Sequence, residues 1–347
     1  MNNGINRENE ANTLQVTGGS GHLGFRVIVS ALEAGYKVRA AVRSEDKASA
    51  IKAAPSVSRY LDSIEFTIVP DILEDGAYDK AVKGVSYILH SASPISFPTD
   101  DPERDLIEPA VKGTTGILKS AAKISTIKRI VITSSEVAII PWADFIMNES
   151  DTIWKDTNQI QEPHGPYSNH FEAYAASKVK ALHASEAFIE SVKPSFDVIN
   201  IMPSFIIGRN ELVTDLKDIT KGTNGPALRV LLGEKAPFAN PSTTVYVNDV
   251  AEIEVRALNP KVAGNQNFLV SSGGIKGTTW NDVVEITRRN FPEAVKRNVF
   301  PLDGSQPTKS TKVDSSRTEE VFGIKLADYE TQVKSVVGHY LELYEKQ

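Results

Sequence analysis

A regular alternation of short β-branched runs with helical stretches is the feature that most constrains the fold of this chain. The strand-like runs are TLQVTGG, KVRAAVR, IEFTIVPDI, VSYILHSAS, RIVITSS and FDVINIMPS. Helical spacing falls between them, including one helix around Asp75 to Val82 and another from about Pro109 to Lys123. Strands and helices that alternate at this spacing form right-handed βαβ units in a parallel sheet covered on both faces. We therefore predict an α/β fold with a doubly wound parallel sheet, which binds ligands at the carboxyl ends of its strands.

The segment VTGGSGHLGFRV follows the first predicted strand and has a glycine-rich turn. Gly18, Gly21 and Gly24 suit a tight turn, close backbone approach to a pyrophosphate and close helix–strand contact. The N-terminus of the next helix adds N–H groups and a partial positive charge for the phosphates. A plain strand–helix turn is the competing interpretation, but the position after the first strand of a βαβ unit favours a dinucleotide. We assign Gly18, Gly21, His22 and Leu23 to this site, with His22 as a turn residue and not a catalyst.

The end of the second predicted strand distinguishes between the two nicotinamide cofactors. NAD-binding folds usually have an Asp or Glu there to hold the ribose hydroxyls, whereas this chain reads AAVR at 40–43. A guanidinium binds a 2′-phosphate through two hydrogen bonds, and a carboxylate would repel it. Lys47 and Arg39 add positive potential, although a solvated strand position is an equal interpretation of Arg39. We therefore predict NADP(H), bound through Arg43 and Lys47.

Two later strand ends are expected to line the same groove. Asp71 either accepts a hydrogen bond from the adenine amine or caps a following helix, and the two interpretations have equal weight. Its neighbour Ile72 belongs to the same predicted contact. The small residues of HSAS let a dinucleotide lie close to the backbone, so we assign three of them to the cofactor site: Ser91, Ala92 and Ser93.

Hydroxyl groups at the end of RIVITSS and the later segment YAASK carry the predicted chemistry. On a helix Tyr174 and Lys178 share one face. A nearby ammonium lowers the pKa of a Tyr from about 10 toward working pH, which makes Tyr174 a general acid, and Lys178 also holds the nicotinamide ribose. A strand-end hydroxyl polarises a carbonyl, and we assign Thr133 to the cofactor groove. A helix rim and local caps are the competing interpretations, and the glycine turn favours an active site.

Composition narrows the possible partners. The net charge of −6 and the pI near 5.7 argue against nucleic acid as the main partner. There is no long apolar run for a membrane span, and the polar segment MNNGINRENEAN lacks a secretory pattern. Zero cysteines exclude disulfides and thiolate ligands, and the six His residues lack zinc-ligand spacing. We expect a cytoplasmic protein with no metal, no membrane and no nucleic-acid partner.

The strand–helix rhythm breaks after Ser204, where a loop-rich stretch begins. The segments TVYVNDVAEIEVRAL and NFLVSS then look like a return to the sheet. We predict a flexible leader at 1–12 and a nucleotide-binding domain at 13–204 that regains strands at about 243–272. A smaller C-terminal substrate-binding lobe is expected from 205–242 and 273–347.

The motifs TGGSGHLG, VRAAVR, TSS and YAASK together resemble those of the extended short-chain dehydrogenase/reductase family. More narrowly, the chain is similar to the dihydroflavonol-reductase-like branch, and PDILEDGAYDKAVKGVSYILHSAS resembles the NADPH-dependent aldehyde and ketone (carbonyl) reductases of that branch. The resemblance has specific motifs from about Thr13 to Gly208 and continues more weakly to the C-terminus. It implies a Rossmann-type fold, NADPH as cofactor, and a monomer or homodimer.

Carried over by position, the resemblance implies three catalytic residues: Ser135, Tyr174 and Lys178. It also implies that Arg43 reads the 2′-phosphate and that Pro203 and Ser204 pack on the nicotinamide. The helix asparagine that organises a water in simpler relatives has no counterpart in EPAVKGTTGILKSA. Asp249 in VYVNDVA is predicted to cap a helix.

The predicted reaction is NADPH-dependent reduction of a small, largely apolar aldehyde or ketone, including keto esters and diketones, to an alcohol. Residues after the sheet are expected to line the substrate pocket: Phe97, Glu136, Val137, Phe171 and Phe205. Ordinary core packing is an equal interpretation of the aromatic members. We see no basic cluster in these segments dedicated to a substrate diphosphate or to coenzyme A, which favours a neutral carbonyl compound.

Other classes share parts of this pattern. A sugar-nucleotide epimerase or dehydratase normally has an acid at the second strand end, and a dehydratase needs an adjacent Asp–Glu pair where this chain has Ser135–Glu136–Val137. A 3β-hydroxysteroid-type dehydrogenase often carries a membrane segment. A non-catalytic redox sensor keeps the nucleotide groove but typically lacks the Tyr–Lys pair.

Overall fold

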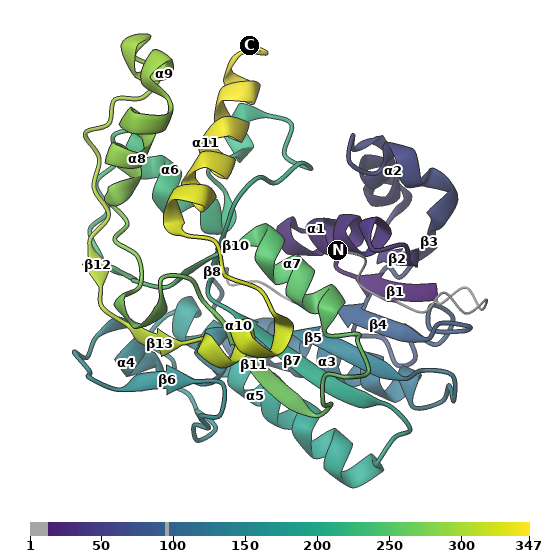
Figure 1. Ribbon diagram of the computed structural model, residues 1–347. Coiled ribbons are helices and arrows are strands. Elements are labelled where there is room, and N and C mark those ends of the chain that lie inside the picture. Colours follow the sequence, from purple (N-terminus) through teal and green to yellow (C-terminus); the bar gives the residue numbers. More distant parts are fainter. Residues whose placement is uncertain (1–12, 94–96) are drawn as a thin grey trace.

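Seven parallel strands form the central sheet, in the order β11-β7-β5-β4-β1-β2-β3 (Figure 1). The computed structural model describes residues 13–93 and 97–347, so the predicted leader at 1–12 and residues 94–96 lie outside the described part. The sheet confirms the predicted α/β, Rossmann-type fold. Its strands are β1 Thr13–Thr17, β2 Lys37–Val42, β3 Ile64–Ile68, β4 Tyr87–His90, β5 Arg129–Thr133, β7 Asp197–Pro203 and β11 Gln266–Val270.

Helices cover both faces of this sheet. α1 (His22–Glu33) packs against α7 (Val247–Arg256) on one face, and α3 (Glu108–Ala121) packs against α5 (His170–Val192) on the other (Figure 1). The central strands are therefore buried on both sides, which explains their near-continuous apolar runs. The strand order reverses between β1 and β4, so the switch point at which such sheets bind ligands lies at the carboxyl ends of these two strands.

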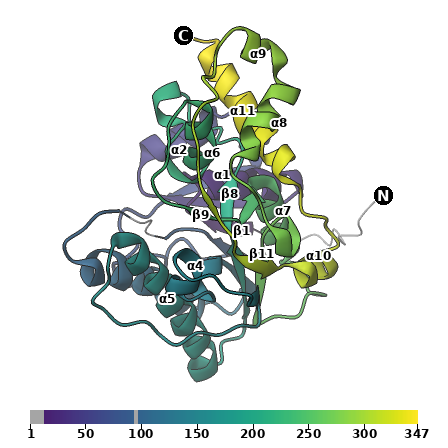
Figure 2. The same ribbon diagram turned by 90° about the vertical axis from the view of Figure 1, so that its left-hand side faces the viewer.

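A second apolar cluster lies away from the sheet, among helices of the C-terminal third (Figure 2). α6 (Gly225–Leu231), α8 (Asp282–Asn290) and α11 (Tyr329–Tyr344) surround the fully buried Trp280. The Trp280 indole N–H donates to the Pro241 carbonyl at 2.8 Å, so the ring is held by a polar contact as well as by packing.

Short parallel pairs connect this cluster to the sheet. β8 (Phe205–Ile207) follows β7 directly and pairs with β10 (Thr244–Tyr246), so the chain passes from the sheet into the second cluster. The remaining pairs are β6 with β13 and β9 with β12. The other elements are α2 Glu45–Ala53, α4 Trp142–Ile146, β6 Ile153–Lys155, β9 Asn240–Pro241, α9 Pro292–Lys296, β12 Thr308–Lys309, β13 Lys312–Asp314 and α10 Ser316–Phe322.

Two of the predicted elements were wrong. Residues 75–82 form successive turns instead of a helix, and two glycines adopt the left-handed region there, Gly76 (φ +74°) within the stretch and Gly84 (φ +72°) just after it. The segment TVYVNDVAEIEVRAL was predicted to return to the main sheet, and it does not. Residues 244–246 pair with β8 outside it, and the buried positions of 247–256 follow the spacing of a helix, α7. NFLVSS does join the sheet, as β11.

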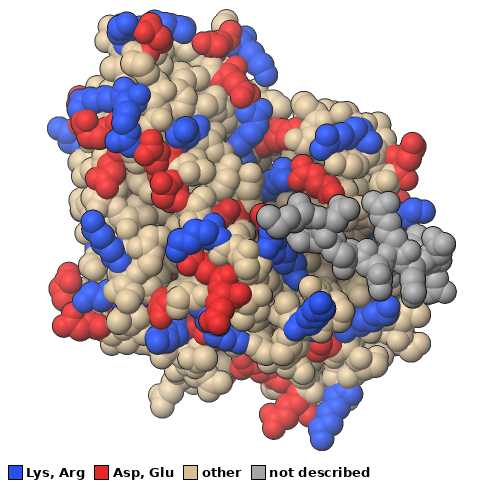
Figure 3. All heavy atoms as spheres, in the orientation of Figure 1, with Lys and Arg blue, Asp and Glu red and all other residues tan. Residues whose placement is uncertain are grey.

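Within the described ranges, we find no helix that is both long and apolar enough to cross a membrane. The same ranges contain no group of His, Asp or Glu side chains that could hold a metal ion. On the face shown in Figure 3, Lys and Arg side chains are interspersed with Asp and Glu, so neither sign of charge dominates that face.

Candidate active site

The glycine turn after β1 lies against the end of β4. Gly18 has a φ of +72°, and a Cβ on it would come within 2.7 Å of the Ala92 backbone nitrogen. A Cβ on Gly24 would collide with the Gly18 carbonyl, so α1 starts in direct contact with the turn. The Gly21 N–H donates to the Gly18 carbonyl at 2.9 Å and closes the turn. Glycine is therefore required at positions 18 and 24 if the turn is to lie at the switch point.

The N-terminus of α1 is open to an anion. Its N-cap residue, Gly21, is extended (φ −93°, ψ 171°), no side chain caps the helix, and its first turn carries no acidic residue. The first N–H groups of a helix lack intrahelical partners and carry the positive end of the helix dipole. These features fit the diphosphate of a dinucleotide.

His22, the first residue of α1, contacts the second part of the chain. Burial lowers the pKa of its imidazole to about 4, and its Nε2 lies 3.1 Å from the Gly208 carbonyl, so a neutral ring donates to that oxygen. Asn224 holds the same glycine, donating to its carbonyl at 2.7 Å and accepting from its N–H at 3.0 Å. His22 thus ties the glycine turn to the loop after β8, while its neighbour Leu23 is buried in the core.

Arg43 follows β2 next to the glycine turn. β1 pairs with β2 so that Thr17 lies opposite Ala41, which brings Arg43 level with the residues just after β1. Arg43 is exposed, and Lys47 is half-buried one turn along on α2. A cation at this strand end is suited to a 2′-phosphate.

Other predicted cofactor residues have local partners. Arg39 donates to Glu65 at 2.6 Å, so its charge is paired with a carboxylate on the neighbouring strand. Asp71 accepts from the Leu73 N–H at 2.8 Å, and because no helix follows, it closes a turn instead of capping a helix. Ile72 is half-buried beside it.

Ser135 and Tyr174 are brought together by β5 and α5. The Ser135 hydroxyl lowers the pKa of the Tyr174 phenol and so favours its ionised form. Ser135 follows β5 and caps the short 3-10 helix Glu136–Ala138. Ser134 instead donates its backbone N–H to Ile201 on β7 at 2.7 Å, and it lines a small buried chamber. Ser135, and not Ser134, is therefore the hydroxyl that acts on the pKa of the phenol.

α5 holds both residues of the YAASK motif inside the protein. Asn169 caps this helix, and its Oδ1 accepts from the backbone N–H groups of Phe171 at 2.9 Å and Glu172 at 3.0 Å. Tyr174 and Lys178 then lie one turn apart, and the alanines between them are buried. The small residues of the motif let this face of α5 pack closely on the sheet.

Burial, and not Lys178, dominates the pKa of Tyr174. The sequence predicted a pKa lowered toward working pH, and that prediction is wrong for the net shift. Burial raises the pKa of Tyr174 to about 12, the Ser135 hydrogen bond lowers it, and the nearby Glu136 carboxyl raises it. The Lys178 ammonium lies 5.5 Å from the centre of the ring and is itself buried. Tyr174 is therefore fully protonated at neutral pH, as its predicted role of proton donor requires.

Lys178 connects α5 with the end of β4. Its Nζ donates to Ser93 Oγ at 2.9 Å, and burial lowers the pKa of the ammonium to about 8. Ser91 lies on the same segment, and its Oγ is 2.9 Å from Thr133 Oγ1. The segment predicted to accept the cofactor therefore reaches both the strand-end hydroxyls and the lysine.

Two buried carboxyl groups flank the site: Glu136, which the sequence assigned to the substrate pocket, and Glu254, for which it predicted no role. Glu136 Oε1 accepts from the Thr243 hydroxyl at 2.7 Å, and burial raises the pKa of Glu136 to about 8. Glu254 Oε1 lies 2.5 Å from Thr133 Oγ1, and burial raises its pKa to about 7. In the described part of the chain, the second oxygen of each carboxyl has no hydrogen-bond partner. Glu254 shares the buried face of α7 with Val250, a helical spacing that could have identified it.

The predicted pocket residues separate into exposed and buried groups. Phe97 and Phe171 are 43% and 55% exposed. Residues 136–137 are buried, and the half-buried Phe205 packs edge-on against Trp280, with ring centres 5.7 Å apart. Phe205 therefore joins the end of the sheet to the second apolar cluster.

The end of β7 lies where the sequence expected it, at the carboxyl edge of the sheet. Pro203 is the last residue of β7, and the Ser204 N–H donates to the Val270 carbonyl of β11 at 3.0 Å. Asp249 was predicted to cap a helix. It lies inside the first turn of α7 instead and accepts from the Ala327 N–H at 2.7 Å, which ties α7 to the segment before α11.

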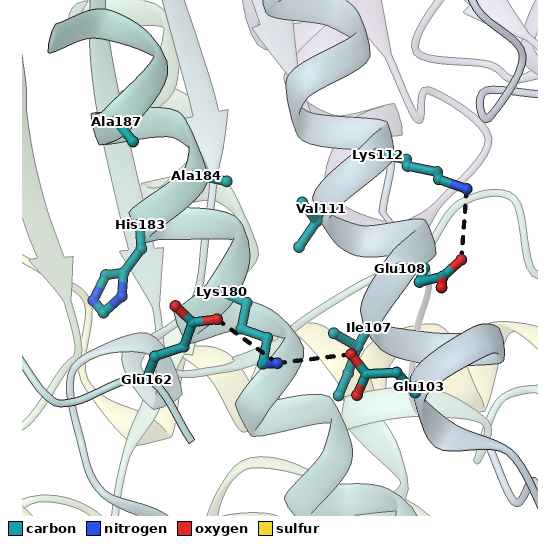
Figure 4. A pocket seen from close by; sticks show the side chains of 10 residues that line it. All are labelled: Glu103, Ile107, Glu108, Val111, Lys112, Glu162, Lys180, His183, Ala184 and Ala187. Atoms are coloured by element: carbon teal, nitrogen blue, oxygen red, sulfur yellow. Dashed lines mark hydrogen bonds and ion pairs between the residues drawn. The ribbon is translucent and has the colours of Figure 1, made fainter. Parts of the chain in front are cut away.

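A surface groove of about 570 Å³ lies between α3 and α5 (Figure 4). Lys180 lies in it and pairs with Glu103 and Glu162, both at 3.7 Å. No residue that lines this groove was predicted for the site. Because successive helix residues turn by about 100°, Lys180 and Lys178 lie on opposite sides of α5.

Comparisons with known proteins agree with this geometry. The model of the NAD dependent epimerase/dehydratase family matches residues 14–271. A protein of Cercospora nicotianae named ketoreductase CTB6 is 42% identical over 340 residues, 95% of each chain. A Candida albicans protein named putative NADPH-dependent methylglyoxal reductase GRP2 is 28% identical, covering 95% of this chain and 98% of its own. The structure of yeast methylglyoxal/isovaleraldehyde reductase Gre2 complexed with NADPH has the same fold, with a TM-score of 0.80 at 23% identity over 96% of this chain and 100% of its own.

Proposed function

This chain belongs to the NAD dependent epimerase/dehydratase family, and from that premise we propose that it reduces a carbonyl compound to an alcohol with NADPH. One observation carries the proposal: Tyr174, whose pKa the Ser135 hydroxyl lowers, lies one helical turn from Lys178, which contacts the end of β4 beside the glycine turn. The names of the two relatives, a ketoreductase and a methylglyoxal reductase, support reduction of a carbonyl.

The described residues fit a dinucleotide with a 2′-phosphate. The uncapped N-terminus of α1 would hold the diphosphate, and the cation at Arg43 would hold the 2′-phosphate. Lys178 and Ser93 would hold the nicotinamide ribose. When bound, NADPH supplies a hydride to the carbonyl carbon. The name of the Candida albicans relative supports this choice of cofactor.

The protein's own groups act on the carbonyl oxygen. The Ser135 hydroxyl donates a hydrogen bond to that oxygen and polarises the carbonyl. Tyr174, which burial keeps protonated, transfers its proton to the same oxygen as the carbon gains the hydride. The positive charge of Lys178 attracts the phenolate that remains.

The substrate of the proposed reaction is a small, largely apolar aldehyde or ketone. We assign its binding to the lobe formed by 205–242 and 273–347, with 13–204 and the segment 243–272, which contributes α7 and β11, as the NADP-binding domain. The aromatic contact between Phe205 and Trp280 supports an apolar wall where the sheet meets this lobe.

The test is a panel of aldehydes, ketones, keto esters, diketones and sugar nucleotides, each incubated with the protein and NADPH or NADH while absorbance of the reduced cofactor is followed. We expect carbonyl-dependent loss of NADPH. Binding of NADPH without turnover would identify a redox sensor, and turnover of sugar nucleotides without net loss of cofactor would identify an epimerase.

The cofactor assignment has its own test in Arg43→Ala. Losing two charge-assisted hydrogen bonds to the 2′-phosphate should raise the KM for NADPH at least tenfold and leave the KM for NADH nearly unchanged. Arg59→Ala, which removes another exposed arginine, is the control. An unchanged preference between the two cofactors in Arg43→Ala would refute the 2′-phosphate contact.

A further inference from the structure

A small chamber lies behind Lys178, on the side that faces the sheet. Its lining includes Lys178 from α5, His90 from β4, Thr114 from α3, Ser134 after β5 and Asn200 from β7. The space in it that the centre of a water molecule can occupy is about 10 Å³. A buried water needs about that volume and two or more polar partners. The chamber therefore has the size and the lining for one water molecule.

His90 is the side chain in this chamber whose bonding is incomplete. It is 2% exposed, its Nδ1 lies 2.9 Å from Thr17 Oγ1, and its Nε2 is buried without a hydrogen-bond partner among residues 13–93 and 97–347. Burial, together with the charge of Lys178, lowers the pKa of His90 to about 3, so the ring is neutral at all working pH values. A buried ring nitrogen without a partner costs free energy that a bound water would recover.

Lys178 has hydrogen-bond donors that a water molecule in the chamber could accept from. An ammonium has three N–H donors, and in the described structure Ser93 Oγ is the acceptor that Lys178 contacts. Burial disfavours its charged form. A second acceptor within the chamber would stabilise the ammonium against this loss of solvation.

We propose that the chamber binds one water molecule, which accepts from Lys178 Nζ and donates to His90 Nε2, and that His90 is thereby a positioning residue that keeps Lys178 charged. The Nδ1–H of His90 then donates to Thr17 Oγ1, which fixes the tautomer. The inference rests on the proposed function, because the reduction needs Lys178 as an ammonium. His90 touches neither the substrate carbonyl nor Tyr174 in this role.

Other titratable groups surround Lys178, and the test must separate them. Tyr174 lies one turn away on the same helix, and Glu136 acts on Tyr174 from the segment after β5. Glu254 reaches the chamber wall through Thr133. The lining residue from α3, Thr114, does not titrate. Of these groups, Glu136 has the pKa nearest to that of Lys178, since burial raises it to about 8. The control background therefore carries Glu136→Gln.

Two substitutions of His90 separate the two ring nitrogens. His90→Asn keeps a polar atom near the Nδ1 position, facing Thr17, but is too short to reach the chamber. His90→Gln keeps a polar atom near the Nε2 position. We expect His90→Asn to move the basic limb of the profile of kcat/KM against pH about one pH unit lower. At pH values above the limb, carbonyl reduction should then be about tenfold slower than in the wild type, and at pH values below it the rate should be unchanged. His90→Gln should restore the profile, and the same shift should appear in the Glu136→Gln background.

Two results would overturn the water site. One is a profile that shifts in His90→Gln but not in His90→Asn, since the ring would then act only through Thr17. The other is a high-resolution crystal structure of the wild-type protein with no ordered water between Lys178 Nζ and His90 Nε2. The crystal structure needs no activity, and thermal unfolding checks that each variant folds. A wild-type protein that holds this water but does not reduce carbonyls would refute the proposed function and leave the water site standing.

Discussion

At the scale of single residues, the same burial moves two pKa values in opposite directions. It raises that of Tyr174 to about 12 and lowers that of Lys178 to about 8, because low polarity favours the neutral form of each group. At neutral pH the phenol therefore keeps its proton, while the lysine still keeps its charge. A proton donor beside a cation is the state that the proposed carbonyl reduction requires.

Ser135 and Ser134 form a matched pair for testing which strand-end hydroxyl acts on the substrate. Ser135→Ala should lower kcat about 100-fold, the size of effect seen when one oxyanion-stabilising donor is lost. Ser134→Ala should have a smaller effect, because Ser134 lines the chamber and does not contact the phenol. Steady-state kinetics on one good substrate measures both, and a larger loss in Ser134→Ala would exchange the two roles.

Glu136 predicts a dependence of stability on pH. Burial raises its pKa from 4.5 to about 8, so the folded protein holds this proton more tightly than the unfolded chain. That contribution to stability is complete below about pH 4.5 and is lost as the pH rises to about 8. The Glu136→Gln side chain does not titrate, so the variant keeps its stability as the pH rises. The Tm of the variant minus the Tm of the wild type should therefore increase between pH 5 and pH 8. A Tm difference that stays constant over this range would contradict a buried, titrating carboxyl.

At the scale of elements, α5 determines where the chemistry lies. Its N-cap, Asn169, accepts two backbone hydrogen bonds, and Glu172 accepts in return from the Ser168 N–H at 2.6 Å. These contacts fix the first turn of the helix, and Tyr174 follows directly. The start of α5 is thus specified by its own sequence, whereas its buried face is specified by packing against α3.

Asn169→Ala should destabilise the protein by about 1 kcal/mol, the usual cost of losing an N-cap side chain. Asn169→Asp keeps the capping oxygen and is the control. Urea unfolding measures both variants. Equal stability of Asn169→Ala and wild type would mean that tertiary packing alone holds the start of α5.

The sequence predicted the elements of the sheet because a buried parallel strand needs a short β-branched run whatever surrounds it. It failed at 75–82, where a predicted helix is a series of turns with left-handed glycines, and at 247–256, where a predicted return to the sheet is the amphipathic helix α7. It also predicted that Ser135 would lie with Tyr174. It missed the net effect of burial on Tyr174 and the burial of Glu254 and His90, because burial depends on contacts between segments far apart in the chain.

At the scale of the whole molecule, Arg129 ties the sheet to the segment after α7. It is buried, pairs with Asp197 at 2.5 Å, and donates to three backbone carbonyls at 257–262. It lies at the start of β5, the end of the strand opposite to Ser135. His22 forms the corresponding link at the other edge of the sheet, between the glycine turn and Gly208.

Arg129→Met should lower the free energy of unfolding by about 3 kcal/mol, because it leaves buried carbonyls and one carboxylate without their partner. Arg288→Met removes an exposed pair with Glu285 and should change stability little. Denaturant unfolding measures both, and kcat should be unaffected in either. A neutral Arg129→Met variant would show that packing, and not this network, holds the end of the sheet.

The central claim is that the protein transfers a hydride from NADPH to a carbonyl carbon. The most direct measurement uses NADPH carrying deuterium at the transferable position of C4, a carbonyl substrate identified in the panel, and mass spectrometry of the product. We predict an alcohol that carries the deuterium on its carbinol carbon, and no such product from Tyr174→Phe, which should still bind NADPH. Bound NADPH whose deuterium never appears in an alcohol, for any carbonyl compound of the panel, would contradict the claim.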